Sequence, residues 1–95
     1  MPSPTPIRSE FVFHGRVQGV GFRWTSASLA EAEGLEGWVR NEPDGTVRMV
    51  VEGPQQVIEG LLASIEARLP GHISHRESLE TVANGEFSGF RILRG

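Results

Sequence analysis

The spacing of hydrophobic positions along the chain predicts strands interleaved with two helices. Phe11 and Phe13 alternate with the intervening positions in a first strand over residues 8–15, as expected when one strand face is buried. Helix formers fill residues 22–33 and stop at Gly34, a residue suited to the end of a helix. Few residues of this helix are apolar, so we expect its apolar side to pack against a sheet.

A hairpin pattern comes next. A second strand is predicted from Leu35 to Asn41, where small or apolar residues alternate with larger polar ones. Glu42-Pro43-Asp44-Gly45 then forms a strong turn signal, with a glycine to supply positive φ. Residues 47–51 alternate again and predict a third strand. These two strands are expected to pair across the turn.

The strongest helical spacing lies in the second half of the chain. Pro54 suits the first turn of a helix, and Pro70-Gly71 ends it. Two last strands are predicted over residues 73–82 and 87–93, around a turn at Asn84-Gly85. The helix presents one apolar face, made of Val57, Ile58, Leu61, Leu62, Ile65 and Leu69.

This order of elements, β-α-β-β-α-β with a small extra strand, predicts the α+β class. We expect a ferredoxin-like sandwich with two helices packed on one face of an antiparallel sheet. In this arrangement the third strand lies between the first two and runs antiparallel to both. The carboxyl ends of the first two strands then share one edge, roughly 10 Å apart. The loop after residue 15 and the side chain of Asn41 can therefore converge.

Length and charge limit the organisation and the partners. The 95 residues allow one small domain, which we assign to residues 8–95, with residues 1–7 as a disordered lead-in rich in proline. A net charge of −3 gives no basic stripe for nucleic acid. No segment has the apolar length of a membrane span or a signal peptide. We expect a cytoplasmic monomer that binds neither nucleic acid nor membrane.

The composition also excludes several phosphate chemistries. The chain has no Cys, which removes disulfides, thiolate zinc sites and cysteine nucleophiles. All nine basic residues are Arg, so a P-loop lysine and a Schiff base are excluded. The only Asp, Asp44, lies in the predicted turn. His72 and His75 are expected on opposite faces of a strand. We therefore expect no metal, no cofactor and no covalent nucleophile.

The segment His14 to Arg23, HGRVQGVGFR, carries the clearest chemical signal. It joins the first strand to the first helix, and its three glycines permit a tight turn with positive φ. Consecutive amides in such a turn, together with a helix N-terminus, form a concave anion site. Arg23 adds a planar fork of donors that suits two phosphate oxygens. The segment predicts a site for a phosphate group.

The same segment resembles the acylphosphatase family. GRVQGVGFR at residues 15–23 is followed by GWVRN at 37–41 and PDGTV at 43–47. The resemblance continues through the closing F-x-x-F-x-I pattern of residues 87–92. It implies hydrolysis of the carboxyl–phosphate bond of small acyl phosphates, with the acyl phosphate and inorganic phosphate as the only partners and no cofactor.

The resemblance also implies residue roles. Arg23 corresponds to the arginine that binds phosphate, and Asn41 to the asparagine that positions the attacking water. Apart from the resemblance, position alone lets either tryptophan, Trp24 or Trp38, border the acyl group, although aromatic residues near a core edge are more commonly structural. A structural role is expected for His14. The loop residues implied in phosphate binding, mainly through their amides, are Arg16, Val17, Gln18, Gly19, Val20, Gly21 and Phe22.

Plainer interpretations remain for each feature taken singly. A glycine-rich turn is often only a tight connection, Arg23 could be a solvated helix residue, and Asn41 could be a turn residue.

Two alternative functional classes remain for the whole chain. The chain could be a non-catalytic ligand-binding or regulatory module, because the same fold supports several functions. It could also be an acylphosphatase-like domain detached from a larger carbamoyl-transferring maturation enzyme. The joint occurrence of the loop, Arg23 and Asn41 outweighs the plainer interpretations. Because the larger enzymes carry zinc-type cysteine motifs and the sequence has no Cys, we expect a stand-alone enzyme.

Overall fold

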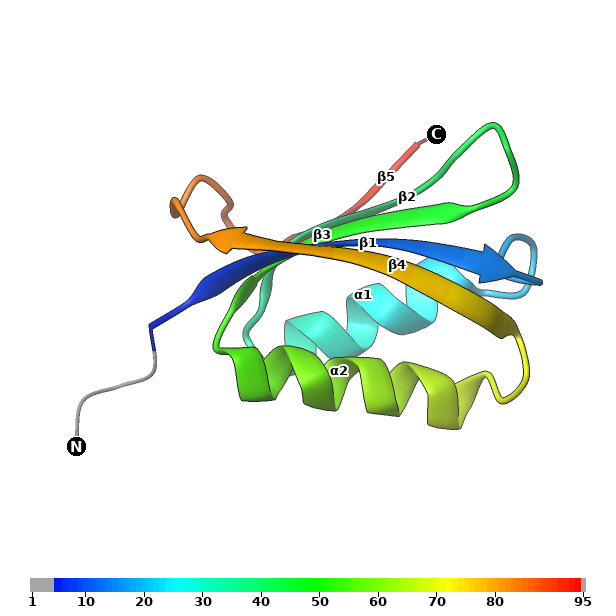
Figure 1. Cartoon of the computed structure of the whole chain (residues 1–95), viewed down its shortest axis with the longest axis horizontal. Coiled ribbons are helices and arrows are strands. Elements are labelled where there is room, and N and C mark those ends of the chain that lie inside the picture. The colour runs from blue at the N-terminus through cyan, green and yellow to red at the C-terminus, as the bar shows by residue number, and fades with distance from the viewer. Residues whose placement is uncertain (1–4, 95) are drawn as a thin grey trace.

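One five-stranded sheet carries both helices on the same face in the computed structural model, which describes residues 5–94 (Figure 1). No helix formed by the described residues covers the other face of the sheet. The elements in chain order are β1 (Ile7–Gly15), α1 (Phe22–Ala32), β2 (Glu36–Asn41), β3 (Val47–Gly53), α2 (Gln55–Arg68), β4 (Ile73–Val82) and β5 (Phe90–Leu93).

The strand order is β4-β1-β3-β2-β5. β3 lies between β1 and β2 and runs antiparallel to both, which confirms the predicted ferredoxin-like arrangement. The edge formed by β5 differs from the expected antiparallel sheet, because β5 pairs parallel to β2 and makes the sheet mixed. The cause is the connection after β4, which crosses from one edge of the sheet to the other before β5 begins. β1, β2 and β5 consequently end at the same edge.

The core fills the space between the sheet and the helices. Phe11 and Phe13 of β1 point into it, and their neighbours Val12 and His14 face the other way, as the alternation predicted. The buried face of α1 is narrow and includes a polar residue, Ser26, whose hydroxyl donates a hydrogen bond to Phe22 O at 2.8 Å. α2 contributes the buried residues Ile58, Leu61, Leu62 and Ile65.

Element boundaries follow the sequence pattern with small differences. α1 ends at Ala32, one residue before the predicted end, and β5 begins at Phe90, three residues later than predicted. Ile7, which the sequence placed in the lead-in, is the first residue of β1 and packs on the core. Residues 1–4 of that lead-in lie outside the described part of the chain. None of the helices in residues 5–94 has the length and apolar composition needed to cross a membrane.

A buried carboxylate anchors the connection between β4 and β5. Glu52 is only 6% exposed and accepts hydrogen bonds from Arg8 Nε at 2.9 Å, Asn84 N at 3.2 Å and Gly85 N at 3.0 Å. Burial alone would raise the pKa of Glu52, but the hydrogen bonds outweigh it, and its pKa lies below the usual 4.5. Arg8 also reaches Glu86 in the same connection. This cluster fixes the path of the chain toward β5.

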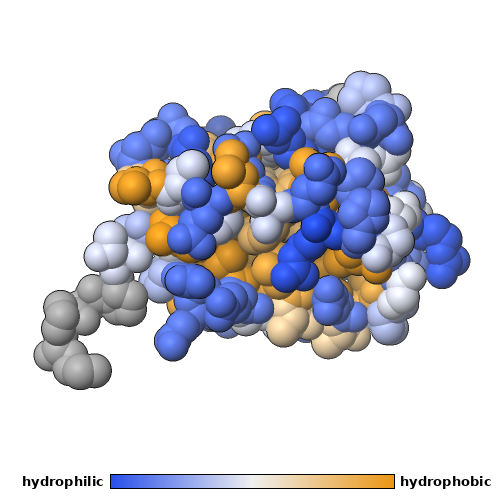
Figure 2. All heavy atoms as spheres, in the orientation of Figure 1, coloured by the Kyte–Doolittle hydropathy of each residue, from blue (hydrophilic) through white to orange (hydrophobic). Residues whose placement is uncertain are grey.

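The surface is mostly polar on the side seen in Figure 1. Figure 2 shows hydrophilic residues over most of this face, with hydrophobic residues visible between them. The exposed large hydrophobic residues of the described chain are few, namely Trp24, Leu79, Val82 and Ile92.

Candidate active site

The loop between β1 and α1 depends on glycines at defined positions. Gly19 and Gly21 have φ of 75° and 80°, in the left-handed region where other residues are strained. Gly15 has a φ of 125°, and a Cβ there would collide with the carbonyl oxygen of His72. Arg16 N donates to that same carbonyl at 2.8 Å. The base of the loop is thus tied to the residue that precedes β4.

The loop amides are available to a ligand. Within residues 5–94, the amides of residues 17–22 donate to no protein acceptor. Gly21, in a left-handed conformation, precedes α1, and the helix has neither a side-chain cap nor an acidic residue in its first turn. Unsatisfied amides at a helix N-terminus attract anions through hydrogen bonds and through the helix dipole. The loop therefore has the chemistry of an anion cradle.

Gln18 connects this loop to the β2–β3 hairpin. Its Nε2 donates to Glu42 O and Thr46 O, each at 2.8 Å. The hairpin is itself closed by Asp44 Oδ1, which accepts from Thr46 N at 3.0 Å and from Thr46 Oγ1 at 2.6 Å. These bonds lower the pKa of Asp44. The side chain of Gln18 thus holds the loop beside the hairpin that carries Asn41.

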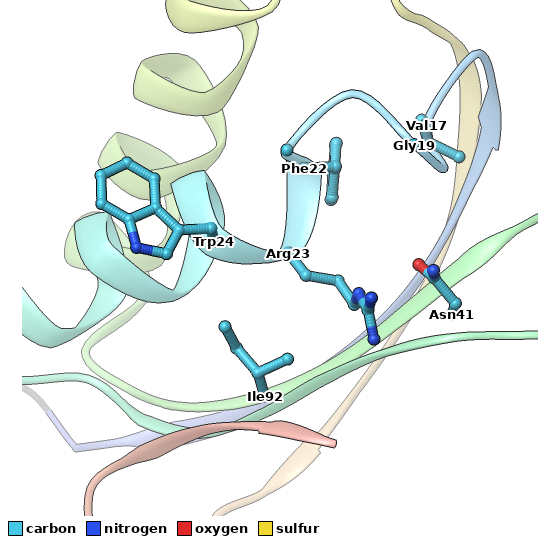
Figure 3. A pocket seen from close by; sticks show the side chains of 8 residues that line it. Val17, Gly19, Phe22, Arg23, Trp24, Asn41 and Ile92 are labelled. Atoms are coloured by element: carbon cyan, nitrogen blue, oxygen red, sulfur yellow. The ribbon is translucent and has the colours of Figure 1, made fainter. Parts of the chain in front are cut away.

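Arg23 lies in the first turn of α1 and crosses the gap toward β2. Its Nη1 donates to Leu93 O of β5 at 3.4 Å. Figure 3 shows its guanidinium directed toward the side chain of Asn41. Leu93 is a contact that the sequence did not predict, because a backbone carbonyl leaves no signal in the residue types. It orients the arginine from the far end of the chain.

Asn41 is the last residue of β2 and faces the helix side of the sheet, like Gly37 and Val39. Its Oδ1 is buried and has no hydrogen-bond partner in the described part of the chain. Buried polar atoms are nearly always paired, so an orphaned acceptor indicates a place where water or a ligand group binds. That oxygen faces the same cleft as Arg23 (Figure 3).

These groups line one cleft of about 210 Å³. The structure brings together the predicted loop, Arg23 and Asn41 there, and it adds Ile92, for which the sequence assigned no role. Three of the predicted loop residues are not on the cleft wall. The amide of Arg16 is bound to His72, the side chain of Gln18 reaches the hairpin, and Val20 packs on the core. The lining residues are Val17, Gly19, Gly21, Phe22, Arg23, Trp24, Asn41 and Ile92.

The two tryptophans differ in their position relative to the cleft. Trp24 lines the cleft and is 68% exposed. Trp38 lies on the opposite face of the sheet, where the guanidinium of Arg40 lies 4.9 Å from its ring centroid. Of the two candidates for bordering an acyl group, only Trp24 lies beside the predicted site.

The histidines lie outside the cleft. The ring of His14 stacks on His75 with centroids 4.0 Å apart, and its Nε2 lies 2.6 Å from Glu77 Oε2. His72 Nδ1 faces Arg16 O at 2.9 Å. In residues 5–94 no three His, Asp or Glu side chains gather closely enough to hold a metal ion.

Comparisons with known proteins identify the family of the chain. The family model for acylphosphatases matches residues 9–92. An acylphosphatase of Arthrobacter sp. (strain FB24) is 48% identical over 90 residues, which cover 92% of this chain and 81% of that protein. The crystal structure of acylphosphatase from Bacillus subtilis superposes with a TM-score of 0.84 at 28% identity, covering 92% of this chain and 98% of that one.

The same fold also occurs inside a longer protein. Full-length HypF, in a phosphate- and nucleotide-bound form, matches with a TM-score of 0.84 and 30% identity over 97% of this chain. The match covers only 12% of HypF, whereas the Arthrobacter and Bacillus proteins match over most of their length. The match to the family model and the relatives of similar length place the protein: the chain belongs to the acylphosphatase family.

Proposed function

We propose that this protein hydrolyses small acyl phosphates to a carboxylate and inorganic phosphate, by in-line attack of a water molecule. The observation that carries the proposal is the meeting of three groups in one cleft: unpaired loop amides, the Arg23 guanidinium and the orphaned Oδ1 of Asn41. Each has a separate role in the reaction, and none of them needs to bond covalently to the substrate.

The loop and Arg23 would bind the phosphoryl group. The loop between Val17 and Phe22 offers amides that have no acceptor within residues 5–94, and Arg23 offers a planar pair of donors. Phosphoryl transfer passes through a loose transition state whose charge spreads over the equatorial oxygens, so preorganised donors stabilise it. Because the amide of Arg16 is already bound to His72, any contribution from Arg16 would come from its exposed side chain.

Asn41 would orient the water. Its Oδ1 accepts a hydrogen bond from the water, whose oxygen lone pair then points at phosphorus. The bond from water oxygen to phosphorus forms as the bond from phosphorus to the carboxylate oxygen breaks, and the electron pair of that bond leaves with the carboxylate. The proton of the water passes to a phosphate oxygen. The leaving carboxylate needs no proton at neutral pH, which fits a cleft whose lining within residues 5–94 contains no carboxyl or imidazole group.

Steady-state turnover in the presence of a chelator tests the proposal. In the presence of the chelator, we expect the protein to hydrolyse benzoyl and acetyl phosphate. It should leave a phosphate monoester nearly unhydrolysed, because an alkoxide leaving group needs an acid and the lining residues described in this cleft supply none. A requirement for added metal, or equal rates on monoesters, would overturn it. A non-catalytic binding module would bind phosphate in calorimetry and show no turnover at all.

A further inference from the structure

We propose that Trp24 and Ile92 form a shelf that binds the acyl group, so that the enzyme favours acyl phosphates with aromatic or extended apolar acyl groups. The inference rests on the proposed function and extends it to the part of the substrate that the phosphate cradle does not touch. We call the two residues the acyl shelf.

The first observation is where the exposed apolar residues lie. Single exposed hydrophobic residues are common and need no explanation. Here, however, Trp24 at 68% and Ile92 at 44% exposure line the same cleft as Arg23, although they come from α1 and β5. The other exposed large hydrophobics of the described chain, Leu79 and Val82, both lie on β4, outside that cleft.

The second observation is the direction in which the shelf lies. Figure 3 shows Asn41 on one side of Arg23, and Ile92 and Trp24 on the other. In-line displacement places the leaving group opposite the attacking water, with phosphorus between them. If Asn41 holds the water, the carboxylate must leave toward the opposite side of the cleft. The acyl chain attached to that carboxylate would then extend over Ile92 and Trp24.

The two walls of the shelf come from two elements that are joined next to them. Ile92 lies beside Val39 in the parallel pairing of β5 with β2, so it faces the helix side of the sheet. Trp24 follows Arg23 directly in α1, and Arg23 donates to Leu93 O, next to Ile92. One hydrogen bond therefore joins α1 to β5 beside the shelf.

The chemistry of the shelf selects the acyl group. An indole face and a branched aliphatic side chain offer dispersion and hydrophobic contact but few hydrogen bonds. Full burial of one methylene strengthens binding about four-fold, so an open shelf covering one side of a chain gives roughly two-fold per methylene. Acetyl and carbamoyl groups are too small to reach far along it. Butyryl, hexanoyl and benzoyl groups are long enough to lie on it.

The test measures kcat/KM for acetyl, butyryl, hexanoyl and benzoyl phosphate, whose carboxylate leaving groups are similarly acidic. For the unaltered protein we expect kcat/KM to rise along the aliphatic series and to be high for benzoyl phosphate. Trp24→Ala should lower the value for benzoyl phosphate roughly ten-fold and that for acetyl phosphate less than two-fold. Ile92→Ala should act in the same direction, and Trp24→Phe should retain most of the preference.

Leu79→Ala provides the matched control, since it removes an exposed hydrophobic residue away from the cleft. It should leave every ratio unchanged. A benzoyl-to-acetyl ratio that stays the same in a folded Trp24→Ala variant would overturn the acyl shelf. An equal fall for all substrates would also overturn it, because it would show a general effect of Trp24 on the site.

A binding measurement separates this inference from the proposed function. Calorimetry with benzylphosphonate and methylphosphonate compares an aromatic and a small ligand that cannot be hydrolysed as acyl phosphates. Trp24→Ala should weaken benzylphosphonate roughly ten-fold and leave methylphosphonate unchanged. Absence of turnover on all acyl phosphates would overturn the proposed function while this comparison still decides the shelf. Equal affinities for the two phosphonates in the unaltered protein would overturn the shelf.

Discussion

At the scale of single residues, the side chain of Arg23 must meet two requirements for binding an anion. It must be held still, which the carbonyl of Leu93 provides, and it must keep donors free for an anion. We expect Arg23→Ala to weaken inhibition by inorganic phosphate at least about ten-fold and to lower turnover, because a charge-assisted pair of hydrogen bonds is lost. Arg23→Lys should also be poor, since a point charge cannot replace the planar fork.

Phosphate binding by calorimetry, beside the kinetic inhibition constant, checks the role of Arg23. Arg68→Gln serves as the control, because Arg68 lies exposed in the last turn of α2, outside the cleft. Unchanged phosphate affinity in Arg23→Ala would place the phosphate cradle elsewhere.

Substitution of Asn41 should affect the rate of the chemical step much more than the affinity for phosphate. Because its Oδ1 has no protein partner in residues 5–94, Asn41→Ala breaks no hydrogen bond of that oxygen, and the melting temperature should barely move. We expect kcat to fall by about 100-fold with phosphate affinity nearly intact, as for a residue that positions a reactant. Asn41→Asp should weaken phosphate binding as well, because a carboxylate would repel the anion. A folded Asn41→Ala variant with near-normal kcat would remove this residue from the mechanism.

At the scale of secondary-structure elements, the proposed reaction depends on how the β1–α1 loop is aligned with the β2–β3 hairpin. Gln18→Ala removes both hydrogen bonds to the hairpin carbonyls. We expect kcat to fall about ten-fold, with a smaller change in phosphate affinity, because the cradle and Asn41 are no longer held in register. Loss of two hydrogen bonds also destabilises the fold by about 1–3 kcal/mol.

Kinetics and urea unfolding of Gln18→Ala together distinguish positioning from simple instability. Gln55→Ala on α2 is the matched control, as it removes an exposed glutamine whose side chain donates to Glu59 of the same helix, away from the cleft. Equal kcat in the Gln18 variant and the unaltered protein would mean that the loop holds its alignment without this tether.

The elements themselves were largely predictable, and the reasons are local. The alternation around Phe11 and Phe13, the apolar face of α2 and the turn at Asp44 each follow from side-chain periodicity or turn chemistry, and the structure has them in place. The glycine loop and Asn41 could be placed at one edge of the sheet because the topology brings the ends of β1 and β2 together.

The parts that could not be predicted depend on contacts between distant residues. Leu93 orients Arg23 through a backbone carbonyl, which has the same chemistry in every residue type. The parallel direction of β5 depends on how the preceding connection crosses the sheet, and four residues carry little pattern of their own. The expectation for Gln18 concerned its backbone amide, and no prediction was made for its side chain, which donates to the hairpin carbonyls.

At the level of the whole molecule, Glu52 links stability to pH. Its pKa in the fold lies below the usual 4.5, so the stabilisation from its charged form is fully present above about pH 4.5 and is lost as the pH falls through the folded pKa. Glu52→Gln should lower the free energy of unfolding at pH 7 by about 1–3 kcal/mol, since buried donors lose a charged acceptor.

Chemical unfolding of both proteins between pH 7 and pH 3 checks the linkage. The difference between Glu52→Gln and the unaltered protein should shrink as the pH falls below about 4.5, where the unfolded chain takes up its proton first, toward the lower pKa of the folded carboxylate. Glu80→Gln, an exposed glutamate on β4, should show little difference at any pH. A difference for Glu52→Gln that stays constant over the whole pH range would rule out titration of Glu52 as the cause.

The common edge at which β1, β2 and β5 end has a consequence for how the protein folds. Each contact that assembles the site closes a long loop of chain: 28 positions separate Gln18 from Thr46, and 70 separate Arg23 from Leu93. Closing such loops costs chain entropy before the contacts repay it, so topologies of this kind fold slowly and as a unit. Partly folded forms that contain only the β2–β3 hairpin or the isolated helices would lack a working site. During refolding, catalysis should therefore recover only when β5 has joined the sheet, and enzymatic activity would report on completion of the fold.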